Sequence, residues 1–337
     1  MPTPLYHTQL VNLLLSQEGA MDKLYSNTSV LLAAALKRYK LKKSAGVWVG
    51  NKSVEIEIDK IIALHAESLK KLIISNVEGS WSLANNANDE VVNDYLKGTD
   101  FSSGDLVTQN TAALAAFTTR KTKNFNLSDR VWRLNAQTKE QLESLVSSGV
   151  LEGRSAANMA TDLKQYLKEP NRRYRRIKDK KTGKLVLSNP AKNYHPGQGV
   201  YRSSYKNALR LSRNETNIAY RTSDHLRVQQ MPFVVGIKVK LSKTHQIYDI
   251  CDELAGEYPK GFLFTGWHVN CLCYTTTISL PKDKFIKYMN TGKIDSKYLV
   301  KSLPLNSIKF ISKNLDKIKK SKPYFYTDNS KYFNNKP

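Results

Sequence analysis

Residues 201–230 constrain the fold most, because they have the pattern of one long amphipathic helix. Apolar residues recur on one side at helical spacing, and arginines and lysines occupy most of the other positions. Directly after Pro232 the pattern changes to the apolar run FVVGIKVKLS, which predicts a strand over 233–241. A second strand is expected over 274–279. A long helix that leads into a small sheet indicates an α+β fold.

The first 120 residues are expected to be helical. Between Ile58 and Ile73 the apolar side chains follow the spacing of an amphipathic helix, and His65 on that side is expected to be a core residue. Breaks are predicted within residues 81–89 and 98–104, with shorter helices over 91–96 and 106–117.

Two helices with clear boundary signals follow. The first is predicted to start at Thr138 and to stop at Gly149, and the second to start at Ser155 and to stop before Pro170. We therefore predict a predominantly helical α+β protein. Its expected parts are a helical N-terminal arm (1–120), a compact domain with one long helix and a small sheet (121–280), and a basic C-terminal tail (281–337).

The charge favours a polyanionic partner. The net charge is +24 at pH 7, and DNA, RNA and an anionic membrane are all compatible with it. Nine lysines and arginines lie between 168 and 187, where a turn at 179–183 predicts an exposed basic hairpin. The predicted phosphate contacts are Arg172, Arg173, Arg175, Arg176, Lys178, Lys180, Lys181 and Lys184. A solvated surface explains the same charge run equally well.

The C-terminal segment is also basic. Nine lysines and two aspartates lie between 301 and 337. Residues 306–321 fit a lysine-rich helix, and the last dozen residues are expected to be flexible unless they bind a partner. Aromatic residues among lysines suit a single-stranded nucleic acid or a protein groove equally well.

Cysteine content and hydropathy predict the compartment. Three cysteines do not make a disulfide framework, since an odd number leaves one unpaired. The N-terminus MPTPLYHTQL lacks the regions of a signal peptide, and the apolar run 30–36 is too short to cross a bilayer. We expect a soluble intracellular protein without a membrane partner.

The soft metal ligands of the chain lie mostly between the two predicted strands. Cys251, His268, Cys271 and Cys273 have the ligand types of a zinc site, although their spacing differs from two Cys-x-x-Cys pairs. The alternative is an apolar corner in which the cysteines act as small hydrophobic residues. The motifs of a zinc deaminase, a Walker loop, a dinucleotide turn and a nucleophile elbow are missing from the sequence, so we predict a protein that is not an enzyme.

The chain resembles a known family over residues 127–278. The order of the segment LSDRVWRLNAQTKEQLESLV, the helix RLSRNETNIAYRTSDHLR, the run VVGIKVKLS and the closing motifs DICDELAG and GWHVNCLC is similar to the phage head morphogenesis family typified by the F protein of phage Mu. The matching motif residues are Arg213, Glu215, Asp249, Asp252 and Gly256, together with the cysteines and His268. Glu215 has no cation at helical spacing, so a distant cation is expected for it.

The resemblance implies a function. Members of this family are minor capsid proteins at the portal vertex that assist head assembly or contact packaged DNA. The chain is therefore expected to be a virion protein made in the bacterial cytoplasm, with a portal or capsid protein and DNA of any sequence as partners. A nucleic-acid-processing enzyme or toxin-like effector is the alternative, and a separate nucleic-acid-binding module is a third. Fewer than sixty residues after 280 are too few for most catalytic domains.

Overall fold

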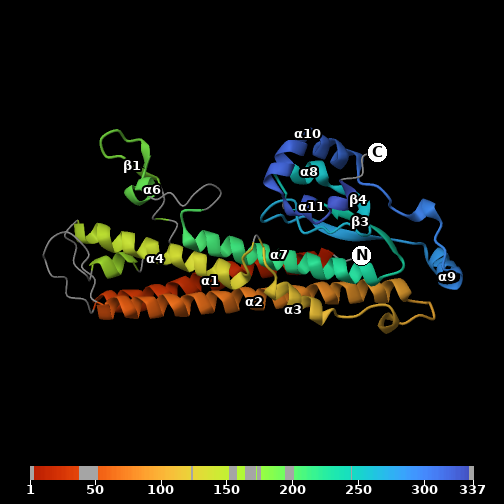
Figure 1. Cartoon of the computed structure of the whole chain (residues 1–337), viewed down its shortest axis with the longest axis horizontal. Coiled ribbons are helices and arrows are strands. Elements are labelled where there is room, and N and C mark those ends of the chain that lie inside the picture. The colour runs from red at the N-terminus through yellow and green to blue at the C-terminus, as the bar shows by residue number, and fades with distance from the viewer. Residues whose placement is uncertain are drawn as a thin grey trace. The chain divides into compact units, whose positions relative to one another are not determined.

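The computed structural model describes residues 4–37, 52–122, 124–151, 158–163, 172, 176–193, 201–243 and 245–333. They form a predominantly helical α+β fold with two small antiparallel sheets (Figure 1), which confirms the predicted fold class. The long helices are α1 (Pro4–Lys37), α2 (Lys52–Leu96), α4 (Leu127–Leu151) and α7 (Ser204–Gln230). The shorter helices are α3 (Thr111–Thr119), α6 (Asn189–Asn193), α8 (Ile250–Leu254), α9 (Lys282–Thr291), α10 (Leu305–Ser321) and α11 (Tyr324–Thr327).

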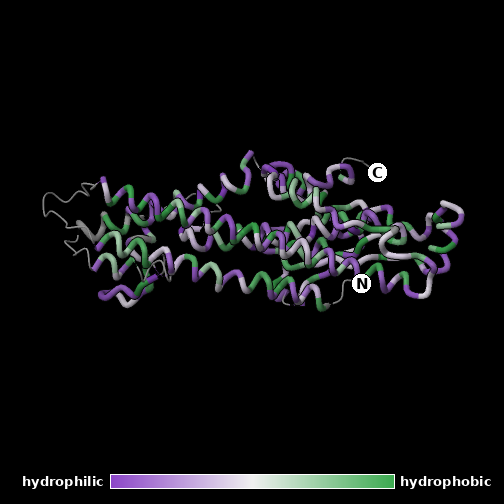
Figure 2. The backbone as a smooth tube through the Cα atoms, turned by 90° about the horizontal axis from the view of Figure 1, so that it is seen from below, coloured by the Kyte–Doolittle hydropathy of each residue, from purple (hydrophilic) through white to green (hydrophobic). Residues whose placement is uncertain are grey.

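Hydrophobic and hydrophilic residues alternate over short distances along the helices (Figure 2). This alternation is what helices with one apolar side require. Within the described ranges, no helix combines the length and the apolar character needed to cross a membrane.

The chain divides into two compact units, each built from segments that are distant in sequence. Unit 1 contains Met1–Leu14, Asn76–Thr118 and Arg213–Pro337, and unit 2 contains Leu15–Ser75 and Thr119–Ser212. One division lies next to the predicted boundary at 120, but none lies near 280. The first 120 residues are therefore not a separate arm, because α1 and α2 contribute to both units.

Helix α2 continues through the predicted break at 81–89. Asn88 Nδ2 donates to the Ala84 carbonyl at 2.8 Å and to Asp224 Oδ1 at 2.9 Å, and the Trp81 side chain is buried. Because the amide finds partners inside unit 1 and the apolar side chains pack, tertiary contacts override the weak helix propensity of asparagine. The prediction of a break was wrong for this reason.

Unit 1 is built around a three-stranded antiparallel sheet of order β4-β3-β5. The central strand β3 (Val234–Lys240) pairs with β4 (Gly256–Pro259) and β5 (Tyr274–Ser279). The strands β3 and β5 were predicted, whereas the four residues of β4 are too short and too rich in Gly and Pro to be recognised. The sheet packs on one apolar core that includes Val234, Val235, Ile237, Val239, Leu254, Tyr258, Phe262, Phe264, Trp267 and Phe285.

The described C-terminal segment is part of this core, and Tyr326, Tyr332 and Phe333, which belong to the last dozen residues predicted to be flexible unless bound, pack against it. Ile311 and Ile318 of α10 and Phe325 of α11 are buried at intervals of seven residues. The Phe325 ring lies 5.5 Å from that of Trp267, and Asn329 Oδ1 accepts from the Leu263 amide at 2.7 Å. The lysines between these residues masked the apolar stripe, although the predicted helix itself is confirmed as α10.

Unit 2 contains α4, which begins before the predicted start at Thr138. Asn126 and Asp129 cap its N-terminus with reciprocal side-chain to backbone bonds of 2.9 Å. The Thr138 hydroxyl instead donates to the Leu134 carbonyl at 3.0 Å inside the helix. The predicted start at Thr138 was therefore wrong: threonine is a common N-cap residue, but here it lies inside the helix. Of the second predicted helix, residues 158–163 are described and helical.

Unit 2 also contains the predicted basic hairpin. Strand β1 (Arg176–Lys178) pairs antiparallel with β2 (Leu185–Leu187). In the turn, Asp179 Oδ1 accepts from the Lys181 and Thr182 amides at 3.0 and 2.7 Å, and Gly183 adopts a φ of +69°. These contacts confirm the hairpin that the turn residues predicted.

Candidate metal centre

Helix α8 positions Cys251. Its N-cap is Asp249, whose carboxylate accepts from the Cys251 amide at 2.6 Å, and the Asp252 carboxylate accepts from the Asp249 amide at 2.8 Å. This reciprocal capping box fixes the first turn of a helix that has only five residues. It directs the Cys251 side chain into the interior, where the residue is 1% exposed.

The three cysteines converge next to the start of β5. The Sγ atoms of Cys251, Cys271 and Cys273 lie within 4.8 Å of one another, and those of Cys251 and Cys271 are 3.8 Å apart. Two sulfur ligands of a tetrahedral zinc ion are about 3.8 Å apart, given Zn–S bonds of about 2.3 Å. The three residues are buried free thiols, so their sulfur atoms have the spacing of a zinc site without disulfide bonds.

His268 lies beside Cys251, with one ring nitrogen directed at its sulfur atom. Its Nε2 is 3.2 Å from Cys251 Sγ, and its Nδ1 is 2.8 Å from the Val269 carbonyl oxygen. A carbonyl oxygen only accepts, so Nδ1 carries the proton and Nε2 presents its lone pair to the cluster. Histidines that bind metals usually have this arrangement, with the other ring nitrogen donating to a fixed acceptor.

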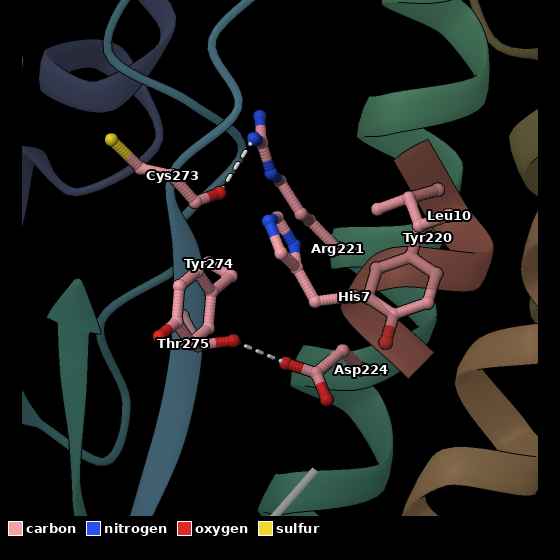
Figure 3. A pocket seen from close by; sticks show the side chains of 8 residues that line it. All are labelled: His7, Leu10, Tyr220, Arg221, Asp224, Cys273, Tyr274 and Thr275. Carbon is pink, nitrogen blue, oxygen red and sulfur yellow. Dashed lines mark hydrogen bonds between the residues drawn. The ribbon is translucent and has the colours of Figure 1, made fainter. Parts of the chain in front are cut away.

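Arg221 of α7 holds the cysteine loop in place. Its guanidinium donates to the carbonyl oxygens of Cys271 and Cys273 at 2.5 and 2.9 Å and to that of Thr265 at 2.8 Å. The bond to Cys273 is drawn in Figure 3. Gly266 makes room for this contact, since it has a φ of +117° and a Cβ there would lie 2.5 Å from Arg221 Nη1. One buried arginine thus fixes the backbone on both sides of the cluster.

The pKa values of the three thiols are shifted in different directions. Hydrogen bonds from the thiols of Cys251 and Cys273, with a smaller contribution from the Arg221 charge, lower the pKa of Cys271. The same hydrogen bonding to Cys271 is the main cause that raises the pKa of Cys251. The cluster therefore favours one thiolate, and a metal would have to displace the protons of the other two.

A pocket of ≈ 270 Å³ opens beside the cluster and offers a route for an ion. Its lining includes His245, Asp249, His268 and Asn270. His245 Nε2 is 2.8 Å from Asp252 Oδ2, and this hydrogen bond raises the pKa of His245. A ring nitrogen of His245 also lies within 4.8 Å of an Asp249 oxygen and of Cys251 Sγ, but its Nε2 is engaged by Asp252, so His245 is not one of the predicted ligands.

Polar residues on the other side of Arg221 support β5 (Figure 3). His7, Tyr220, Asp224 and Thr275 surround a cavity of ≈ 20 Å³, room for about one water molecule. Asp224 accepts from Thr275 Oγ1 at 2.8 Å, and burial raises its pKa. This cavity is too small for a substrate, so these residues are best explained as structural.

The structure brings the three predicted cysteine ligands together and places the predicted ligand His268 beside Cys251. The three cysteines also belong to the apolar core that contains Trp267, so the metal centre and the apolar corner both stay predictions. Sequence reasoning missed Arg221, which was assigned to the charged outer side of the helix and is 5% exposed. Only its contacts in space reveal its role.

The other motif residues have local structural roles. Arg213 Nε donates to the Leu14 carbonyl at 3.3 Å, and Glu215 is buried. Gly256 has a φ of +153°, and a Cβ there would lie 2.7 Å from Pro304 Cγ, so no larger residue fits. The distant cation expected for Glu215 stays a prediction.

The predicted phosphate contacts divide into two groups. Arg173 and Arg175 lie outside the described residues. The described members are exposed on or beside the hairpin: Arg172, Arg176, Lys178, Lys180, Lys181 and Lys184. Their exposure permits contact with phosphates but does not distinguish it from a solvated surface.

No protein-family model, curated protein or solved structure matches this chain. The resemblance to the phage head morphogenesis family therefore stays a prediction that rests on the motif residues.

Proposed function

We propose that the chain is a non-enzymatic minor head protein of a phage, which acts at the portal vertex and contacts DNA. The observation that carries this proposal is the convergence of the motif residues. Asp249 caps the helix that holds Cys251, His268 lies beside Cys251, and the two closing cysteines lie within 4.8 Å of it although they are 20 and 22 residues further along the chain. Residues that carry the family resemblance thus act together as one structural element.

We propose that this element binds one zinc ion through Cys251, His268, Cys271 and Cys273. Four protein ligands fill a tetrahedral sphere and leave no position for a substrate, which is the arrangement of a structural zinc site. The zinc would tie α8 to the start of β5. This role agrees with a protein that assembles with partners rather than catalyses a reaction.

DNA contact is assigned to the basic hairpin. Its cations are exposed on a two-stranded ribbon, and its turn is held by Asp179. Contacts to phosphates are independent of sequence and weaken with salt, by a log–log slope of about 0.9 for each contact to a duplex. Replacing Arg176, Lys178, Lys180 and Lys181 by glutamine is expected to reduce that slope.

Mass spectrometry of purified virions and a pull-down with the portal protein test the proposed location. We expect the full chain to be present in virions in few copies and to co-purify with the portal or capsid protein. Absence from virions, together with no association in the pull-down, would contradict the proposal. Deleting residues 301–337 is not a usable variant in this test, because it removes Ile311, Ile318 and Phe325 from the core.

A further inference from the structure

One face of the basic hairpin combines cations with leucines. In the register of the two strands, Arg176 of β1 stands opposite Leu187 of β2. Two residues further along β1, Lys178 stands opposite Leu185. Because directly opposite residues of an antiparallel pair share a face and residues two apart do so as well, all four side chains lie on one face. We call it the mixed face; its cations come from β1 and its leucines from β2.

The leucines of the mixed face are exposed. Leu185 is 66% exposed and Leu187 is 36% exposed. A solvated basic surface accounts for the cations of the hairpin but not for two leucines beside each other on one short strand, because exposed apolar side chains that cluster usually mark a contact site. The opposite face carries Ile177 and Val186 and has no cation. The mixed face therefore fits a partner that is acidic and also offers apolar groups.

The charge of the hairpin decides the class of partner. Residues 176–187 contain five lysines and arginines against Asp179. In the part of the chain that the structure describes, no carboxylate forms an ion pair with Arg176 or Lys178. A duplex carries one negative charge per roughly 1.7 Å of its axis, so it supplies several phosphates within the length of the hairpin.

The dimensions of the hairpin match one groove of a duplex. Its two strands lie about 4.8 Å apart and its side chains stand out from both faces, whereas the major groove of B-form DNA is about 12 Å wide and about 8.5 Å deep. The minor groove, at about 6 Å, is too narrow for a ribbon with side chains. On the floor of the major groove the C5-methyl group of thymine is the apolar group that a leucine can contact.

We infer that the mixed face enters the major groove of duplex DNA, with the leucines of β2 against thymine methyl groups and the cations of β1 on the phosphates at the edge of the groove. The inference rests on the proposed DNA contact of the hairpin and adds the class of nucleic acid. Double-stranded RNA does not fit, because its major groove is deep and narrow and its uracil bases lack the methyl group.

The experiment uses the full chain and changes one leucine. Leu185→Gln removes the apolar contact, and Leu185→Met keeps an apolar side chain of similar size. Leu305→Gln is the matched control, since Leu305 is 76% exposed and belongs to unit 1 rather than to the unit of the hairpin. Fluorescence anisotropy over a salt series measures binding to a thymine-rich DNA duplex, to the same duplex with uracil in place of thymine, and to the corresponding RNA duplex. Thermal melting confirms that each variant is folded.

We expect the parent protein to bind the thymine duplex roughly fourfold more tightly than the uracil duplex, the value of about one buried methyl group, and to bind the RNA duplex more weakly still. Leu185→Gln should bind the thymine duplex roughly tenfold more weakly than the parent protein, about the value of burying half of a leucine side chain. It should also lose the preference for thymine and keep the salt slope. Leu185→Met and Leu305→Gln should behave like the parent protein.

Equal affinity of the parent protein for the thymine and uracil duplexes would overturn the inference. A preference for thymine that survives in Leu185→Gln, or equal binding by Leu185→Gln and Leu185→Met, would overturn it as well. In each of these cases a steep salt slope would leave the phosphate contacts of the hairpin standing. A parent protein that bound none of the duplexes would overturn both the inference and the proposed DNA contact.

Discussion

His268 and His65 each have an Nδ1 that is hydrogen-bonded to an oxygen atom, but their Nε2 atoms differ in what they face. In unit 2 the His65 ring is buried, its Nδ1 is 2.9 Å from the Thr28 hydroxyl, and its Nε2 has no partner among the described residues. In unit 1 the His268 Nδ1 is likewise fixed, by a carbonyl, but its Nε2 points at Cys251. The first is a core histidine and the second is a candidate ligand.

The surroundings of the second ring nitrogen decide the role of each histidine. Thr28 donates its own hydroxyl proton to the Leu24 carbonyl, so its oxygen accepts from His65 and leaves Nε2 among apolar groups. At His268 the second nitrogen lies 3.2 Å from Cys251 Sγ, and that sulfur in turn lies within 4.8 Å of the sulfur atoms of Cys271 and Cys273. Chelation, mutation and pH should therefore affect the two regions differently.

The largest expected effect is loss of the metal from unit 1. Cys271→Ser removes one of three thiolates, and we expect zinc content to fall from about one per chain to near zero, with destabilisation on the order of 5 kcal/mol, below the 10–16 kcal/mol typical of zinc-finger peptides because an apolar core is also present. Elemental analysis and chemical denaturation measure both. His245→Asn is the control and should retain zinc.

Packing provides the next largest effect. Phe325→Ala opens a cavity beside Trp267, and truncation of a buried phenylalanine typically destabilises by about 3–5 kcal/mol. We expect this loss in denaturant unfolding with the zinc content unchanged. If the variant were as stable as the parent protein, the C-terminal segment would not belong to the core.

Arg221→Met separates positioning of the ligands from general stability. It leaves three buried carbonyl oxygens without their donor, at a cost of roughly 1–3 kcal/mol, and should also weaken zinc binding. Arg227→Met is the matched control, since Arg227 is buried on the same helix and pairs with Asp89 instead. Equal zinc affinity of the two variants in a chelator competition would count against a positioning role.

The smallest effect concerns His65 and pH. Burial lowers the pKa of His65 to about 4, so below about pH 6.5 the unfolded chain binds a proton that the folded chain does not. The free energy of unfolding should therefore decrease as the pH is lowered from about 6.5 to about 4, by up to about 1.4 kcal/mol per pH unit. His65→Asn should reduce this dependence, as measured by denaturation at several pH values. An unchanged dependence would mean that His65 titrates normally.

Local patterns were sufficient for much of the fold. Helical period predicted α7 and α10, alternation and β-branched residues predicted β3 and β5, and turn residues predicted the hairpin. Long-range contacts decided the rest. Asn88 keeps α2 continuous by bonding to Asp224, and Phe325 reaches Trp267, and neither contact has a signal in the residues next to it.

The candidate site divides in the same way. Ligand types identified Cys251, His268, Cys271 and Cys273, because soft ligands are rare in this chain and these lie close together in sequence. Their mutual distances and the tautomer of His268 depend on Arg221, on the Asp249 cap and on the Val269 carbonyl. No sequence pattern marks these three residues as neighbours of the cysteines, so only the fold shows their contacts.

X-ray absorption at the zinc edge of the purified full chain measures whether Cys251, His268, Cys271 and Cys273 bind a zinc ion. We predict one shell of three sulfur atoms at about 2.3 Å and one nitrogen at about 2.0–2.1 Å, with the nitrogen contribution lost in His268→Ala and retained in His245→Asn. Purified protein without zinc, or a shell of oxygen and nitrogen atoms without sulfur, would contradict the account.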